Sequence, residues 1–183
     1  MKPYTSKAKK AIDLAARISK KMNYSYIGTE HILAGLIKEG TGVAAEVLTA
    51  CNVEYDKLIS MIEDLISPGD NIEVMDRDGY SPRTQRVLAR ASEEADRFEC
   101  NEIGTEHLLM AIVLQGDCAA ARLLNTMGVN SQKMFIDILG AMGEDPSAYK
   151  DLMKSYNTSY NSATPVLDQY SRDLTDMAEA GLL

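Results

Sequence analysis

The chain has 183 residues, of which 45% are hydrophobic and 25% charged, and its formal net charge is −8. This length supports one good core or two small ones, and a composition without Trp favours helices packed through small side chains. The acidic balance argues against non-specific nucleic-acid binding, although residues 1–25 hold seven Lys or Arg against one acid, Asp13.

The first predicted helix runs from Thr5 to Met22, with Thr5 or Ser6 as its cap. Six residues at helical spacing form one face, and the basic residues lie mostly elsewhere: Ala8, Ala11, Ile12, Ala15, Ser19 and Met22. Such a basic amphipathic helix either touches a membrane or an acidic partner, or presents a solvated basic face from a helix packed on the core. The mostly alanine apolar face favours the second interpretation.

Three shorter helices complete the first half, beginning after a loop that ends at Gly28. Thr29 is the predicted N-cap of the first of them, and Gly40 and Gly42 separate it from the next. The predicted segments are Thr29–Lys38, Gly42–Asn52 and Glu54–Ile66.

The second half repeats the first. Ile-Gly-Thr-Glu-His occurs at residues 27–31 and again at 103–107, and residues 4–66 align without a gap on residues 80–142, with fifteen of 63 positions identical. We therefore predict an all-α fold of two tandem four-helix repeats, 1–66 and 80–143, with pseudo-twofold symmetry and a linker at 67–79. The expected helices of the second copy are Ser81–Phe98, Thr105–Leu114, Asp117–Met127 and Ser131–Ala141.

Residues 144–183 lie beyond the repeats and are predicted to be a helical extension and linker. One helix is expected from Asp145 to Tyr156, then a polar tether at 157–164, then an amphipathic helix at Pro165–Ala180. That last helix has nothing left to pack against, so we expect the chain to stop at a cut edge rather than at a finished terminus.

The three cysteines are odd in number and have no Cys-x-x-Cys spacing, which favours buried free thiols in a reducing cytosol. The N-terminus lacks an apolar signal region, and no run approaches 18 apolar residues. We therefore expect a cytoplasmic protein that is neither secreted nor spans a membrane.

His31 and His107 each follow a glutamate, which raises the possibility of acid–base or metal chemistry. Thr-Glu-His is not the zinc motif His-Glu-x-x-His, and no Cys or Asp cluster completes a metal site nearby. Packing and hydrogen bonding are the preferred roles for both. No Ser-His-Asp pattern and no phosphate-binding P-loop are present, so we expect no catalysis, metal or cofactor in this chain.

The starts of the two repeated helices are the candidate binding sites. Each provides free backbone N–H groups, a hydroxyl and a carboxylate at one helix N-terminus. The N–H groups suit a phosphate and the carboxylate suits a guanidinium, so the set matches a ligand with both charges, although an ordinary helix cap has the same residues. The candidate residues are Gly28, Thr29, Glu30, Gly104, Thr105 and Glu106.

The doubled Gly-Thr-Glu-His-[Ile/Leu]-Leu helices, Gly-Thr-Gly-Val-Ala-Ala at Gly40–Ala45 and Tyr80-Ser81-Pro82-Arg83 resemble the Clp N-terminal domain, especially that of ClpC-type unfoldases. Residues 164–175 are also similar to the segment just before the first AAA+ module of such proteins. In the second copy, Gly116-Asp117-Cys118-Ala119 departs from the Gly-x-Gly-Val pattern.

The resemblance implies a domain that recruits clients and adaptors, such as MecA-like proteins, to a hexameric ATPase that feeds a ClpP-type protease. ATP and Mg²⁺ would belong to the absent ATPase modules. It also implies recognition of phosphoarginine, with the guanidinium on Glu30 or Glu106 and the phosphate at a helix N-terminus. An alternative is a free-standing accessory protein that docks on a Clp machine without a motor.

Overall fold

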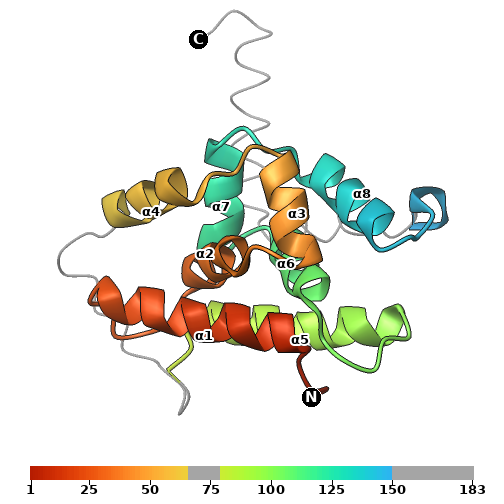
Figure 1. Ribbon diagram of the computed structural model, residues 1–183, viewed down its shortest axis with the longest axis horizontal. Coiled ribbons are helices and arrows are strands. Elements are labelled where there is room, and N and C mark those ends of the chain that lie inside the picture. The colour runs from red at the N-terminus through yellow and green to blue at the C-terminus, as the bar shows by residue number, and fades with distance from the viewer. Residues whose placement is uncertain (66–78, 150–183) are drawn as a thin grey trace, which may run out of the picture. The chain divides into compact units, whose positions relative to one another are not determined.

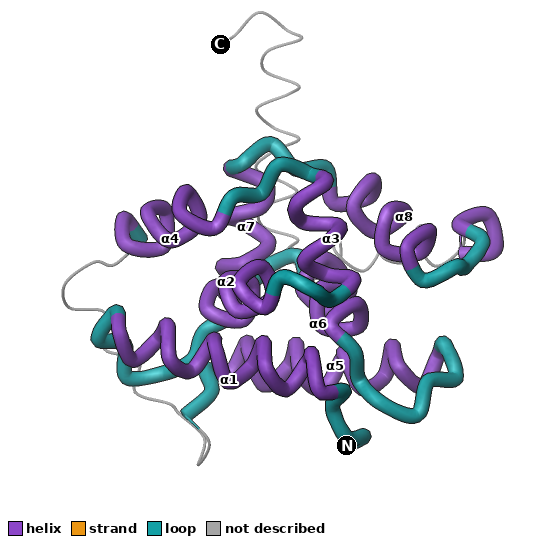
Figure 2. The backbone as a smooth tube through the Cα atoms, viewed as in Figure 1, coloured by secondary structure: helices purple, strands orange, loops and turns teal. Residues whose placement is uncertain are grey.

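The structure is a computed structural model that describes residues 1–65 and 79–149, and these residues form helices joined by loops (Figures 1 and 2). The chain divides into two compact units, Met1–Glu144 and Asp145–Leu183. The helices are α1 (Ser6–Lys21), α2 (Thr29–Glu39), α3 (Val43–Ala50), α4 (Tyr55–Asp64), α5 (Pro82–Arg97), α6 (Thr105–Gln115), α7 (Ala119–Thr126), α8 (Ser131–Ala141) and the 3-10 helix η1 (Pro146–Tyr149).

The predicted all-α class is confirmed, and seven of the eight repeat helices begin within one residue of the predicted start. The exception is α7, which begins at Ala119 rather than at Asp117 because Cys118 is its N-cap. The described part of the predicted helix from Asp145 is the 3-10 turn η1. The rest of that helix, the final helix at Pro165–Ala180 and most of the predicted linker lie outside the described residues.

The helix starts follow the expected capping chemistry in α1, α5 and α8. The side chains of Thr5, Ser81 and Asn130 each accept a hydrogen bond from the backbone N–H three residues later. Such caps satisfy donors that have no partner within the helix. Pro82 takes the first position of α5, where the missing N–H costs nothing.

The core centres on α2 and α6, whose side chains are buried on almost every side. Figure 1 shows α1 and α5 running along one side of this pair, with α3 and α7 on the other. Within the described residues no single helix is long and apolar enough to cross a membrane, and α6 with α7 reaches that length only as a pair bent by 83°.

The two repeats are interlocked rather than merely adjacent. Tyr4, just before α1, forms a parallel backbone bridge with Ile103, just before α6. Tyr80, just before α5, forms the matching bridge with Ile27, just before α2. Because Tyr4 and Ile27 align on Tyr80 and Ile103, the exchange is that of a pseudo-twofold axis.

The fourth helices of the repeats differ in their packing. α8 packs against α3, α6 and α7, whereas the main partner of α4 is α2. Phe135 and Leu139 of α8 are buried, but the aligned residues of α4, Ile59 and Glu63, are not. Leu65 at the end of α4 is 53% exposed. Helix α4 therefore leaves part of its surface open.

The prediction of buried thiols is wrong for two of the three cysteines. All three are free, but only Cys118 is buried. Cys51 is the C-cap of α3 and faces Asp137, and Cys100 lies in the loop after α5, so both are partly exposed. Helical periodicity overestimated the burial of Cys51 because the residue lies at the end of its helix.

Candidate functional site

Each Gly-Thr-Glu-His segment begins a helix in the same way. Gly28 is the N-cap of α2, so Thr29 is the first helical residue and not the predicted cap. The Nδ1 atom of His31 accepts a hydrogen bond from the Gly28 N–H at 2.8 Å, and His107 accepts one from Gly104 at the same distance. The histidine thus has the role of the third-position residue in a capping box.

The threonine hydroxyls do not cap their own helices, and they form hydrogen bonds between the repeats. The Thr29 hydroxyl accepts a hydrogen bond from the Ala120 N–H at 3.2 Å, at the start of α7. The Thr105 hydroxyl accepts the equivalent bond from Ala44 at 3.3 Å, at the start of α3. Each site is consequently built from the N-termini of helices from both repeats.

We expect Thr29→Val and Thr105→Val each to lower the free energy of unfolding by about 1–2 kcal/mol, because each leaves a buried backbone N–H without its acceptor. Urea denaturation of the 183-residue chain measures this. Thr126→Val is the matched control, since that hydroxyl donates to the carbonyl of Arg122 at an exposed position. Equal stability of Thr29→Val and Thr126→Val would show that the cross-repeat bond contributes nothing.

Both histidines are buried and neutral. Desolvation lowers the pKa of His31 to about 4, and desolvation also lowers the pKa of His107, where Glu106 acts in the opposite direction. The His31 ring packs nearly perpendicular to Tyr24, with ring centroids 4.4 Å apart. The expected packing and hydrogen-bonding role therefore agrees with the geometry of both residues.

The Glu30 carboxylate folds back over the helix start. It lies so close to Gly28 that a β-carbon at residue 28 would overlap the carboxylate oxygens. Burial raises the pKa of Glu30, whereas hydrogen bonds from its own backbone N–H and from Thr29 lower it. A buried carboxylate with exposed edge atoms gains most from a cation, since the cation replaces the lost hydration.

A pocket of about 300 Å³ adjoins this carboxylate. Its lining combines the first turns of α2, α5 and α7, so three helix N-termini converge on one small volume. The lining residues are Tyr26, Thr29, Glu30, Ser81, Pro82, Arg83 and Ala119. Helix N-termini favour an anion, while Glu30 favours a cation, so the pocket offers both charges to one ligand.

Arg83 adds a cation to the anion-binding side. Its guanidinium donates to the Asp117 carbonyl and lies 3.6 Å from the Asp117 carboxylate. The side chain is 46% exposed and so remains accessible to solvent. Arginine presents several donors in a planar fork, which suits phosphate oxygens.

The second copy has the same plan with different side chains. Lys7 replaces Arg83 and donates to the Thr41 carbonyl at 3.0 Å, the counterpart of the Asp117 carbonyl. The Glu106 side chain is 23% exposed, compared with 9% for Glu30. The two helix starts therefore differ in solvation and in the shape of their basic group.

The altered sequence at Gly116–Ala119 keeps the course of the turn but changes its hydrogen bonds. The Glu39 carboxylate accepts from the Thr41 and Gly42 N–H groups in the first copy, whereas the Gln115 amide donates to the Asp117 carboxylate in the second. Gly116 has a positive φ of 66°, like the 79° of Gly40 in the first copy. Cys118 takes the extended N-cap conformation that Gly42 has. The start of α7 is therefore placed like the start of α3.

The structure brings the candidate residues of each copy together, but it keeps the two copies as separate sites. Sequence reasoning missed Arg83, Ser81 and Ala119, which come from the opposite repeat. The sequence alignment that pairs Tyr4 with Tyr80 could have indicated them, because it places these residues at the starts of helices that correspond between the two repeats. Within residues 1–65 and 79–149, no group of three or more His, Cys, Asp or Glu has the arrangement of a metal site.

Comparison with known proteins agrees with the doubled motif. The chain matches the family described as "Clp repeat (R) N-terminal domain" over residues 3–127 and again over 79–176. It is 37% identical over 98% of its length to an "ATP-dependent Clp protease ATP-binding subunit ClpA homolog" of Porphyra purpurea, covering 22% of that protein. It is 34% identical over 96% of its length to "Negative regulator of genetic competence ClpC/MecB" of Bacillus subtilis, covering 21%.

The fold supports the same relationship. The N-terminal domain of the chaperone ClpD from Arabidopsis thaliana superposes with a TM-score of 0.62 at 22% identity, over 76% of this chain and 96% of that one. The chain spans about a fifth of the length of the relatives named above. From the doubled helix starts, the interlocked repeats and the family match, the chain belongs to the Clp repeat (R) N-terminal domain family.

Proposed function

We propose that this chain is the substrate- and adaptor-recognition domain of a Clp-type unfoldase that delivers clients to a ClpP-type protease. The names of its relatives, which are ATP-binding subunits and chaperones of the Clp system, support this role. The domain itself would not catalyse a reaction. ATP and Mg²⁺ would be bound by ATPase modules elsewhere in a cytoplasmic hexamer, and partners would include MecA-like adaptors.

The ligand that fits the candidate site best is a phosphoarginine side chain on a client. The observation that carries this proposal is the pocket in which the Glu30 carboxylate faces the N-termini of α5 and α7. A phosphorylated guanidinium places a cation beside a phosphate on one planar group. Glu30 would bind the guanidinium, while Arg83 and the helix N-termini would bind the phosphate.

Binding of a phosphoarginine peptide, measured by titration calorimetry with the whole chain, tests the proposal. We expect the Glu30→Ala, Glu106→Ala double variant to lose at least about tenfold in affinity, since each buried charge-assisted contact contributes about 1.5–3 kcal/mol. Each single variant should keep one site. Glu63→Ala, at an exposed position of α4 that does not line the pocket at Glu30, should bind like the unmodified chain.

Two further peptides control for charge alone. An unmodified arginine peptide carries only the cation and a phosphoserine peptide only the anion, so both should bind more weakly than phosphoarginine. Unchanged affinity in the double variant would reject the Gly-Thr-Glu pocket as the site. Family membership does not depend on this result.

A further inference from the structure

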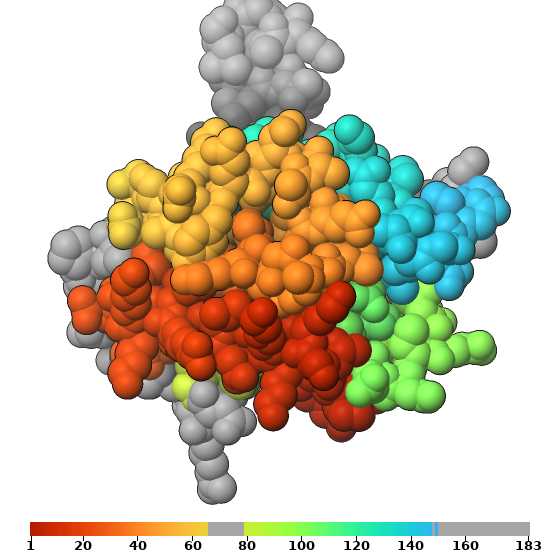
Figure 3. Space-filling model, in the orientation of Figure 1, coloured from red at the N-terminus to blue at the C-terminus, as the bar shows by residue number. Residues whose placement is uncertain are grey.

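A groove of about 700 Å³ separates α1 from α4 in the first repeat. It shares no lining residue with the pocket at Glu30. Its floor is apolar, with Leu14 and Ile18 on α1, Met22 at the C-cap of α1 and Ile59 on α4, and all of these except Ile18 are partly exposed. Figure 3 shows the surfaces of α1 in red and α4 in yellow on one face of the molecule.

The side chains that line the groove have the spacing of helix ridges. On α1 they follow every fourth residue through Leu14, Ile18 and Met22, and on α4 through Tyr55, Ile59 and Glu63. Each row covers about two turns, or about 12 Å. Rows at this spacing receive the side chains of another helix packed ridge into groove, so the shape fits a helical segment of about two to three turns in contact.

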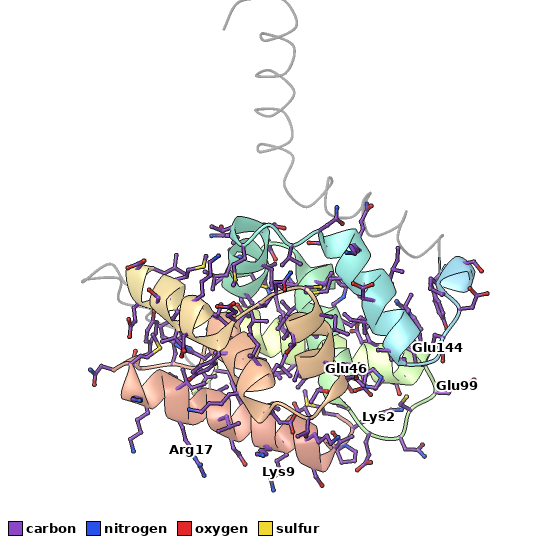
Figure 4. All side chains as sticks on the ribbon, turned by 45° about the horizontal axis from the view of Figure 1, so that its top comes forward. Lys2, Lys9, Arg17, Glu46, Glu99 and Glu144 are labelled. Carbon is purple, nitrogen blue, oxygen red and sulfur yellow. The ribbon has the colours of Figure 1, made fainter. Side chains whose placement is uncertain are left out.

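The two walls carry opposite charges. Arg17 and Lys21 stand on α1, and Asp56 and Glu63 stand on α4, all of them exposed. None of these four forms an ion pair with another described residue. Figure 4 shows Arg17 projecting from α1 away from the body of the domain. Lys38 of α2 also lines the groove, and its Nζ lies 5.3 Å from the centroid of the Tyr55 ring. The α1 wall is therefore basic, and the two carboxylates of the lining both lie on α4, across an apolar floor.

The residues that line this groove are not repeated in the second copy. Arg90 and Glu94 replace Leu14 and Ile18, and the buried Glu94 carboxylate pairs with Arg97 at 3.0 Å. On the facing helix, the positions of Ile59 and Glu63 hold buried apolar residues of α8. The two repeats therefore share the Gly-Thr-Glu helix start but not the lining of the groove. The helix start and the groove are thus two different kinds of surface.

We propose that the α1–α4 groove docks an amphipathic helix of a partner protein. This helix would have a narrow apolar stripe, acidic residues along the flank that meets α1 and basic residues along the flank that meets α4. The inference rests on the proposed recognition function and deepens it. It gives the first repeat a docking surface that recognises the charge pattern of a helix rather than a phosphate.

The direct test uses a labelled 18-residue helical peptide with leucines at every third and fourth position, Glu along one flank and Lys along the other. A control peptide has the same composition and leucine stripe, with Glu and Lys mixed on both flanks. Fluorescence anisotropy with the whole chain should show about tenfold tighter binding of the segregated peptide, decreasing with salt. Equal binding of the two peptides would overturn the proposal.

Charge reversal adds a second, sharper readout. Arg17→Glu with Lys21→Glu makes both walls acidic and should weaken the segregated peptide about tenfold. Adding Asp56→Lys and Glu63→Lys should restore binding. The α1 wall is then acidic and the α4 wall basic, so the peptide can bind with its helix direction reversed, which exchanges its two flanks. Failure of that restoration in folded protein, checked by circular dichroism, would also overturn the proposal.

Phosphoarginine binding separates the two proposals, since none of the four reversed residues lines the pocket at Glu30. All groove variants should retain it. If phosphoarginine binds but the segregated peptide behaves like its control, the groove is wrong and the proposed function stands. If the peptide shows the expected pattern but phosphoarginine does not bind, the ligand of the Gly-Thr-Glu pocket is wrong.

Discussion

Replacement of Gly35 by alanine is expected to destabilise the domain by about 3 kcal/mol, or roughly 10 °C in midpoint temperature. Gly35 lies in α2 against the backbone of α1. A β-carbon at this position would overlap the Ala11 carbonyl oxygen and lie 3.0 Å from the Ala15 nitrogen. Backbone atoms cannot rotate away as a side chain can, so the two helices would have to separate.

Gly140→Ala is the matched control, because nothing lies within 4 Å of a β-carbon there. Gly140 is an exposed position within α8, so alanine should raise stability by about 0.5–1 kcal/mol through helix propensity. The same substitution therefore has opposite signs at the two sites. Thermal unfolding of Gly35→Ala at or above the unmodified midpoint would contradict the close α1–α2 contact.

Acidification is the second large expected effect. His31 has its pKa lowered to about 4 in the folded chain, against about 6.5 when unfolded. Between these values the unfolded chain binds the proton and the folded chain does not, so stability is complete above pH 6.5 and declines as the pH falls toward 4. The free energy of unfolding should decrease by about 3 kcal/mol from His31 alone, and His107 acts in the same direction.

Glu30 opposes this trend, since its pKa is raised and protonation favours the folded state. The histidine contribution is isolated by His31→Gln with His107→Gln. Glutamine can accept the N-cap hydrogen bond but does not titrate in this range. Urea denaturation from pH 7.5 to 4 should give a flatter profile for the variant, and parallel profiles would rule out the neutral buried histidines.

The sequence predicted the helices well because helical periodicity and an ungapped repeat both report which face of each helix is buried. Neither pattern predicts which helix packs against each buried face. Tyr4 pairs with Ile103 rather than within its own repeat, and the Thr29 hydroxyl accepts a hydrogen bond from Ala120 of the other repeat. Both contacts depend on how two repeats interlock, which no local pattern encodes.

The site shows the same division. Glu30 and Glu106 were identified from the doubled motif, but Arg83 joins Glu30 only through the exchange of helix starts between repeats. Gly35 was also missed, because a glycine inside a helical pattern carries no sign of a close backbone neighbour. The open face of α4 follows from differences in burial between aligned residues, such as Ile59 and Phe135. The repeat alignment does not predict these differences, because it pairs two apolar residues.

We propose that the domain binds a doubly charged ligand at two corresponding places, the starts of α2 and α6. The most direct measurement is an NMR titration of the isotope-labelled chain with free phosphoarginine. We predict that backbone amides of residues 28–31 and 104–107 both shift, together with Arg83, at a stoichiometry of about two ligands per chain. Shifts confined to other surfaces, with both Gly-Thr-Glu-His segments unchanged at saturation, would contradict the account.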